Sequence, residues 1–225
     1  MVPAFRRLES VLADIFQEVE EDLRRDKAAE YWKRYGRYII AAAVFIVVAT
    51  AAYVGWKEYR QRQLTAYGER FAAALTLVQQ KKEAEALAAF DALAKDAGVG
   101  YGTLARFRAA AVKSHQGDRA GAAAIYEAVA RDGGVDPLYA ELALLYYVLE
   151  MLESGDPADL AKRLEPLLAP KGAWRYSARE LAAILALRTG DAGKAREHFT
   201  ALADDPKTPN GVRARAAEML RALKQ

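Results

Sequence analysis

The first part of the chain places apolar residues on one side of a predicted helix and charged residues on the others. The apolar residues that recur at helical spacing are Phe5, Leu8, Leu12, Ile15, Phe16, Val19 and Leu23. This pattern predicts an amphipathic helix within residues 1–37. It would either dock on a partner or a lipid surface, or only solubilise and orient the next segment. Its acids and bases balance, whereas a lipid-binding helix is usually rich in Lys and Arg, so the lipid surface is the less favoured partner.

An uncharged run follows, from Tyr38 to Trp56. As a helix rising about 1.5 Å per residue it would span roughly 28 Å, close to the ~30 Å hydrocarbon core of a bilayer. Its large apolar residues lie all around the helix, and aromatic residues bracket it, as in a membrane-spanning helix. The residues expected to form this anchor are Tyr38, Ile39, Ile40, Phe45, Ile46, Tyr53 and Trp56.

Two other interpretations of the run remain. A buried core helix would suit a shorter run with less regular flanks. A cleaved signal peptide would use the small residues Ala49-Thr50-Ala51 as its cleavage site. However, the segment ahead of the run is long and rich in acids, unlike the short basic start of a signal peptide. The pattern therefore favours an anchor that is retained.

Orientation in the membrane follows from the basic residues beside the run. The N-terminal flank has Arg24, Arg25, Lys27, Lys33, Arg34 and Arg37, whereas the C-terminal flank has Lys57, Arg60, Arg62 and Arg70. This modest excess predicts a cytoplasmic N-terminus. The remaining chain would then face the periplasm, if the source is a Gram-negative bacterium.

The chain after the run contains a repeated pattern. Aligning its segments on the large residues Phe90, Tyr126, Leu164 and Phe199 gives steps of 36, 38 and 35 residues. Four residues earlier stand Ala86, Ala122, Leu160 and Ala195, and three residues later stand Leu93, Val129, Leu167 and Leu202. Each aligned segment is expected to be the second helix of a hairpin. From the second unit on, a Gly-Asp turn precedes that helix, at Gly117-Asp118, Gly155-Asp156 and Gly190-Asp191. The first unit has Lys81-Lys82 instead. Gly would end one helix and Asp would cap the next.

A period near 34 residues with two helices per unit is the tetratricopeptide pattern. The first helices of the hairpins would cover roughly residues 67–79, 102–115, 138–153 and 177–188, and residues 210–223 would form a capping helix. The predicted fold class is therefore all-α, in three parts: an amphipathic segment (1–37), a transmembrane helix (38–56) and a repeat solenoid of about four hairpins (57–225).

In such an array the first helices line the concave side. The residues expected there are Phe71, Leu75, Leu104, Phe107, Arg108, Leu142, Leu145, Tyr146, Leu149, Leu181 and Ile184. Many of these side chains would pack against their own hairpin in any case. If they face the concave side, they form an apolar groove suited to extended hydrophobic polypeptide.

Composition narrows the function without identifying it. The net charge is +3 with opposite charges interspersed, so no basic stripe for nucleic acid appears. With no Cys and with only two distant His residues, His115 and His198, no metal site is expected. Gly-rich phosphate loops and nucleophile elbows are also absent from the sequence. We expect a protein without cofactors that is not an enzyme.

The flanks of the run resemble a known family. The polar lead Tyr31-Trp32-Lys33-Arg34-Tyr35-Gly36, one span, a Gly55-Trp56 exit and a compact repeat domain are similar to YfgM-like proteins, whose repeat domain shares its name with the cell-division coordinator CpoB. The lead Glu18–Gly36 looks like the alphaproteobacterial branch, and Met1–Ala13 lies outside the resemblance. The resemblance implies an inner-membrane accessory of the SecYEG translocon. It would associate with the membrane chaperone PpiD and help newly exported polypeptides.

Three functions follow as hypotheses. The first is a translocon-associated chaperone accessory that binds clients or a chaperone through the groove. The second is a structural scaffold for envelope assembly or cell division, with no client binding. The third, an enzyme, would need a cluster of perturbed groups in one pocket.

Overall fold

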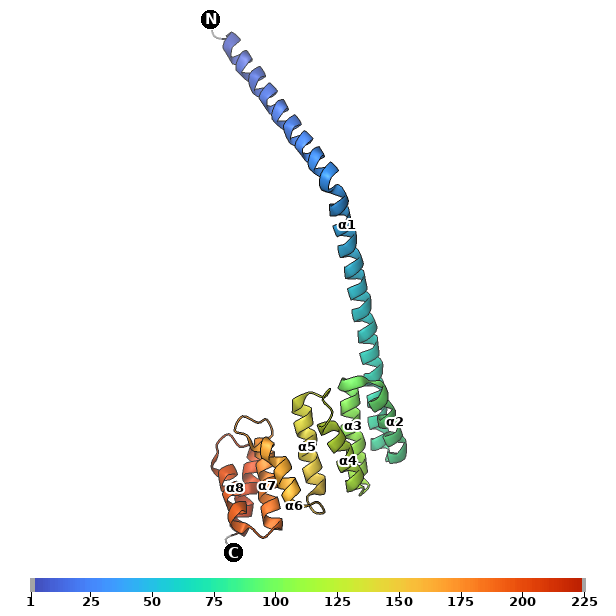
Figure 1. Cartoon of the computed structure of the whole chain (residues 1–225), viewed down its shortest axis with the longest axis vertical. Helices are drawn as coiled ribbons and strands as arrows, with labels where there is room; N and C mark the ends of the chain where they lie inside the picture. The colour runs from blue at the N-terminus through green and yellow to red at the C-terminus, as the bar shows by residue number, and fades with distance from the viewer. Residues whose placement is uncertain (1–2, 224–225) are drawn as a thin grey trace. The chain divides into compact units, whose positions relative to one another are not determined.

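The computed structural model describes the backbone of residues 3–223 and the side chains of residues 24, 25, 27 and 29–223. This part of the chain is helical throughout, without strands (Figure 1). The helices are α1 (Pro3–Gln79), α2 (Glu83–Asp96), α3 (Gly98–His115), α4 (Arg119–Ala130), α5 (Pro137–Met151), α6 (Pro157–Leu164), the 3-10 helix η1 (Glu165–Leu168), α7 (Arg175–Arg188), α8 (Ala192–Asp204) and α9 (Asn210–Ala222). The side chains Phe5 to Leu23 of the predicted amphipathic face lie outside the described ones.

Helix α1 is longer than any single predicted element. It runs without interruption through the predicted amphipathic segment, the predicted anchor and the first helix of the first repeat. The sequence has no proline between Pro3 and Pro137, and isolated glycines such as Gly55 do not end a helix. The chain nevertheless divides into two compact units, residues 1–63 and residues 64–225.

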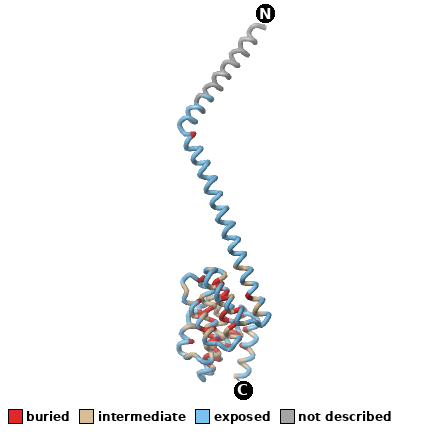
Figure 2. Tube along the Cα trace, turned by 90° about the vertical axis from the view of Figure 1, so that its right-hand side faces the viewer, coloured by how far each residue is buried: buried red, intermediate tan, exposed pale blue. Residues whose placement is uncertain are grey.

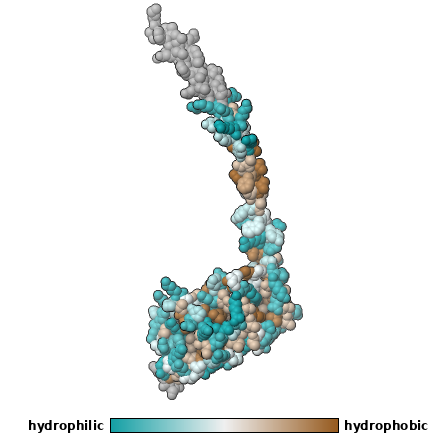
Figure 3. All heavy atoms as spheres, viewed as in Figure 1, coloured by the Kyte–Doolittle hydropathy of each residue, from teal (hydrophilic) through white to brown (hydrophobic). Residues whose placement is uncertain are grey.

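From residue 29 on, the first unit exposes its large apolar residues. From Tyr31 to Tyr59 the large side chains are all exposed, with Phe45 at 73% and Val47 at 67% (Figure 2). The Ile, Val and Phe residues among them form the hydrophobic band that Figure 3 shows on α1. By length and composition α1 can cross a membrane, and it is the one such helix among the described residues. A buried core helix does not fit these exposures, because its side chains would be covered by protein.

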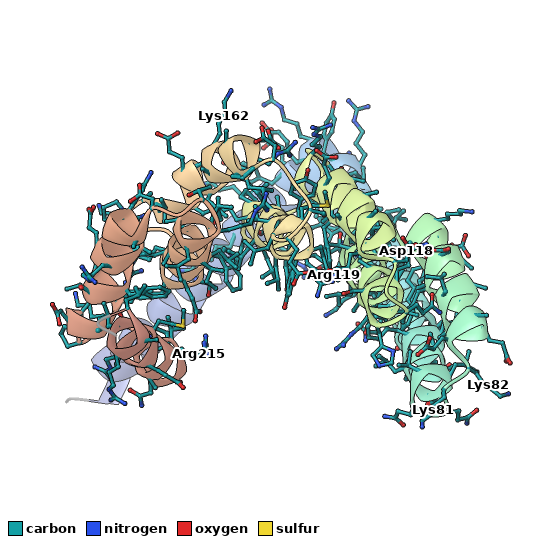
Figure 4. All side chains as sticks on the ribbon, turned by 90° about the horizontal axis from the view of Figure 1, so that it is seen from below. Lys81, Lys82, Asp118, Arg119, Lys162 and Arg215 are labelled. Atoms are coloured by element: carbon teal, nitrogen blue, oxygen red, sulfur yellow. The ribbon has the colours of Figure 1, made fainter. Side chains whose placement is uncertain are left out.

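The second unit confirms the predicted repeat. All twelve aligned positions are buried: Phe90, Tyr126, Leu164 and Phe199, the residues four before them and the residues three after them. Four hydrophobic clusters follow one another along the array, each joining one hairpin to the next helix. Figure 4 shows the hairpins of this unit placed along an arc. The small residues Ala86, Ala122 and Ala195 let neighbouring helices approach closely.

Two of the turns between paired helices, at Gly117 and Gly190, share one geometry. At Gly117 and Gly190 the backbone is left-handed, with φ of 84° and 80°. The amide of Gly117 donates to the Ser114 carbonyl and that of Asp118 to the Lys113 carbonyl, at 2.9 Å each, which is a Schellman motif. The carboxylates of Asp118, Asp156 and Asp191 then cap the next helices. Asp118 and Asp191 therefore take part both in the end of one helix and in the start of the next.

The first turn repeats this geometry with unsuitable residues. Lys81 has φ 59°, its amide donates to the Val78 carbonyl, and the amide of Lys82 donates to the Leu77 carbonyl. Lys82 is the N-cap of α2 but makes no side-chain capping bond. Lys81 and Lys82 lie on the same side of the repeat unit as Asp118, the side that Figure 4 shows.

We expect Lys81→Gly/Lys82→Asp to stabilise the repeat unit. Gly removes the left-handed strain and Asp supplies the missing cap, each by about 1 kcal/mol. Urea unfolding followed by circular dichroism measures the change. Lys81→Ala/Lys82→Ala is the matched control, because it removes the same charges without providing either feature. Equal stability of the two variants would contradict this explanation.

The third unit departs from the predicted regularity. The helix expected after the Gly155-Asp156 turn is split into α6 and η1, because Pro166 has no amide to continue the α-helical bonding. Gly155 is not left-handed, in contrast to Gly117 and Gly190. Instead, the Arg188 guanidinium donates to the carbonyls of Leu152 and Gly155 and satisfies the end of α5 from another repeat.

Candidate functional site: an aromatic groove

Helices α1, α3, α4 and α5 enclose a cavity of about 440 Å³, which we call the aromatic groove. Its lining residues are Phe71, Leu104, Phe107, Arg108, Ala111, Tyr126, Tyr139, Leu142 and Tyr146. The lining is mostly apolar and aromatic, with one cationic side chain and three phenolic hydroxyls. All of it belongs to the repeat unit.

Helical spacing brings these side chains together. Leu104, Phe107, Arg108 and Ala111 follow the i, i+3, i+4, i+7 pattern on α3, so they share one face of that helix. On α5, Tyr139, Leu142 and Tyr146 follow i, i+3, i+7. The two faces meet because α3 and α5 both pack on α4. The groove is therefore a product of two first helices held side by side.

Phe107 is the centre of the aromatic contacts. Its ring centroid lies 5.6 Å from that of Tyr126, 6.1 Å from that of Tyr146 and 6.5 Å from that of Tyr139. Tyr126 and Tyr146 stack at 5.1 Å with an interplanar angle of 18°. Such contacts hold the rings in fixed positions, each pair contributing about 0.5–1.5 kcal/mol beyond its buried area. The groove thus presents preordered aromatic faces.

The polar groups of the groove are few. Burial raises the pKa of the Tyr126 hydroxyl to about 12, and the neighbouring Tyr146 and Glu150 act in the same direction. The Tyr126 hydroxyl therefore stays protonated at neutral pH. Arg108 is exposed, and no carboxylate among the described residues lies within ion-pair distance of it. The groove can consequently offer hydroxyls and one cation to a ligand that is otherwise apolar.

Two neighbouring cavities extend the groove along α3. Leu104 and Tyr139 also line a cavity of about 330 Å³ near the start of α3. Arg108 and Ala111 also line one of about 580 Å³ near its end, which includes the predicted residue Leu75. Helix α3 has 18 residues, about 27 Å at 1.5 Å per residue. The three cavities thus form a track along most of this helix.

The structure does not bring every predicted residue into the groove. Leu145 and Leu181 are only 9% and 7% exposed and belong to the same core cluster. Ile184 packs against the cluster around Phe199. Leu149 is exposed on α5 but does not line the groove. The residues gathered there from the predicted set are Phe71, Leu104, Phe107, Arg108, Leu142 and Tyr146.

Sequence reasoning missed three lining residues, and two of them had a signal. Tyr139 lies three residues before Leu142, so helical spacing on α5 points to it. Ala111 follows Phe107 by four residues in the same way. Tyr126 is one of the aligned large residues of the repeat, and it is buried, with 3% exposure. That it also borders the groove depends on how α4 packs between α3 and α5.

Neither histidine lines the aromatic groove, but His115 lines the 580 Å³ cavity at the end of the track. Nδ1 of His115 lies 2.9 Å from a carboxylate oxygen of Glu83, at the end of α3. Burial lowers the pKa of His198, which lies beside the cavity between α6 and α8. In the described part of the chain no three His, Cys, Asp or Glu side chains gather as metal ligands.

Comparison with known proteins agrees with the repeat geometry. Residues 29–217 match the tetratricopeptide repeat-like domain family, a range that begins ahead of the uncharged run and ends in α9. No curated protein and no solved structure matches the chain. Tetratricopeptide-like repeats are protein-interaction modules, so the chain has an interaction domain. Because the match covers most of its length, the chain belongs to the tetratricopeptide repeat-like domain family.

Proposed function

We propose that the aromatic groove binds extended apolar polypeptide. The observation that carries this proposal is the set of ordered rings around Phe107, which leaves Tyr139 and Tyr146 exposed at 42% and 37%. Rigid aromatic side chains bind apolar segments at low entropic cost, and tyrosine hydroxyls add hydrogen bonds to a peptide backbone. The α3 track of about 27 Å would accommodate about eight residues of extended chain at ~3.3 Å each.

The cellular setting of this binding is part of the proposal. We infer a single-pass bacterial inner-membrane protein, anchored by residues 38–56, with its N-terminus in the cytoplasm and its repeat domain in the periplasm. The exposed apolar residues of α1 and the excess of Lys and Arg ahead of the run support this topology. The groove would then face newly exported chains before they fold.

The partners follow from the resemblance of the flanks to YfgM-like proteins. We propose that the protein is an accessory of the SecYEG translocon. It would receive either exported polypeptides or a PpiD-like membrane chaperone in the groove. Arg108 would add affinity for a partner carboxylate near an apolar segment.

Site-directed crosslinking in intact membranes tests this function. A photo-reactive amino acid at Tyr139 or Tyr146 should capture SecY, a PpiD-like chaperone or a nascent exported chain. The same amino acid at Ala128, an exposed position on α4 outside the groove, is the matched control. If the groove positions capture no more of these proteins than Ala128 does, client binding through the groove is wrong.

We expect Tyr146→Ser to weaken binding of an apolar peptide about tenfold, since an aromatic residue at the centre of an interface commonly contributes more than 1 kcal/mol. Tyr146 is exposed, so the variant should keep its fold. Leu149→Ser, on the same helix but outside the groove, is the control. Isothermal titration with a model apolar peptide measures both. An unchanged affinity for Tyr146→Ser would favour the alternative, a scaffold for envelope assembly or cell division without clients.

A further inference from the structure

The repeat unit exposes apolar residues at one end of its helical hairpins, opposite the turns that join the two helices of each hairpin. Leu64, Val99 and Leu138 are 42%, 51% and 46% exposed, and we call these three the edge patch. Behind them, Leu64 and Val99 help line the 330 Å³ cavity together with Leu104, Val135 and Tyr139. The opposite ends of the first two hairpins carry polar turns instead, at Lys81-Lys82 and Gln116-Gly117-Asp118. One end of these hairpins is therefore apolar and the other is polar.

Chain connectivity places the edge patch near the proposed anchor. Leu64 comes only eight positions after Trp56, the end of the uncharged run. As a helix they cover about 12 Å, and even fully extended they cannot exceed about 28 Å. The headgroup layer of each leaflet is itself roughly 5–8 Å thick. If Trp56 lies at the edge of the hydrocarbon core, a helical tether along the membrane normal would hold Leu64 about 4–7 Å beyond the headgroup layer, so a tilted tether brings the edge patch to the membrane surface.

Other loops at this end are compatible with lipid headgroups. The Trp174 indole nitrogen donates to the Leu138 carbonyl at 3.0 Å, which brings the α6–α7 loop beside the patch. That loop carries the exposed Lys171. The carboxylates of Asp132 and Asp136 accept backbone amides of Gly134 and Leu138, at 3.0 and 2.8 Å. Both carboxylates thus take part in loop structure, and Asp132 also forms an ion pair with Arg106 at 2.9 Å.

We infer that the edge patch rests on the lipid surface of the membrane that holds the anchor. This inference depends on the proposed anchor but not on client binding. Leu64, Val99 and Leu138 enter the headgroup region, Tyr139 lies behind them as an interfacial aromatic residue, and Lys171 meets anionic headgroups. The α3 track begins at this edge, so a chain leaving the membrane would meet the groove at its lipid-facing end.

The chain of 225 residues suits a fluorescence test because it has no Cys. Single-cysteine variants Val99→Cys, Gln116→Cys and Ala43→Cys would carry an environment-sensitive fluorophore. Each is reconstituted into vesicles of phosphatidylethanolamine and phosphatidylglycerol that contain nitroxide lipids. Val99 and Gln116 lie at the two ends of α3, so they form a matched pair. Ala43 lies inside the uncharged run and reports insertion.

Headgroup nitroxides should quench the Val99 label and leave the Gln116 label unquenched, while acyl-chain nitroxides quench the Ala43 label. Adding Leu138→Glu should abolish the difference between Val99 and Gln116 without changing the thermal midpoint, since Leu138 is exposed. Quenching at Ala43 with equal signals at Val99 and Gln116 would overturn the lipid contact alone. A Val99 label shielded only at high protein density would indicate a second copy on the patch and also overturn it. Loss of quenching at Ala43 would overturn the anchor, and this inference with it.

Discussion

Phe90→Ala should destabilise the repeat unit by about 3–5 kcal/mol, the cost of a cavity left by a large buried aromatic ring. Phe90 is fully buried in the cluster with Leu93, Ala105 and Val112, and its ring lies 5.7 Å from that of Phe71. A loss of this size is a large fraction of the 5–15 kcal/mol typical of a domain. Urea unfolding of the protein in mild detergent, followed by circular dichroism, measures it.

Two matched variants serve as controls for Phe90→Ala. Phe90→Leu keeps most of the volume and should cost less than about 1.5 kcal/mol. Val99→Ala removes apolar atoms from an exposed position and should change stability by no more than about 0.5 kcal/mol. If Phe90→Ala cost as little as Val99→Ala, the aligned large residue would not be the packing centre of its repeat.

Ile46→Arg should prevent stable insertion of α1 into a membrane. Ile46 lies near the middle of the uncharged run and is 62% exposed, so a charge there would face lipid. On the insertion scale for the helix centre, Arg costs about 2.5–3.5 kcal/mol, whereas Ile is favourable by about 0.3–0.6 kcal/mol. Carbonate extraction of membranes measures the fraction of protein that remains integrated.

Two controls accompany Ile46→Arg: one keeps an apolar side chain at position 46, and the other changes a charge outside the run. Ile46→Leu should remain integrated like the parent protein, because both side chains favour hydrocarbon. Arg62→Leu, a change of charge outside the run, should also remain integrated. Integration of Ile46→Arg at the level of Ile46→Leu would show that the uncharged run is not surrounded by lipid.

The repeat could be predicted from the sequence because its signal is local. Phe90, Tyr126, Leu164 and Phe199 mark the same packing position in each unit, and all four are buried. The Asp residues 118, 156 and 191 cap helices as their place after Gly indicates. The left-handed Lys81 could not be predicted, since the turn has the hydrogen bonds of its neighbours without their sequence.

The groove could be predicted only in part. Tyr146 and Leu145 are consecutive on α5, so they point about 100° apart around the helix. One lines the groove and the other is buried in the core between α5, α6 and α7. Periodicity showed that both faces of α5 are apolar. It did not show which face the next hairpin covers.

The sequence by itself determined the all-helical repeat, the boundaries of most hairpins and a helix long and apolar enough to span a membrane, because turns, caps and periodicity act over a few residues. The tertiary structure alone decided which apolar side chains the packing of successive hairpins leaves open. Leu181 is buried between α5 and α6, whereas the ring of Phe107 contacts aromatic rings on α4 and α5. Long-range bonds such as Trp174 to the Leu138 carbonyl also depend on that packing. The physical reason is that exposure is a property of neighbours brought together from distant repeats, and the spacing along one helix does not contain it.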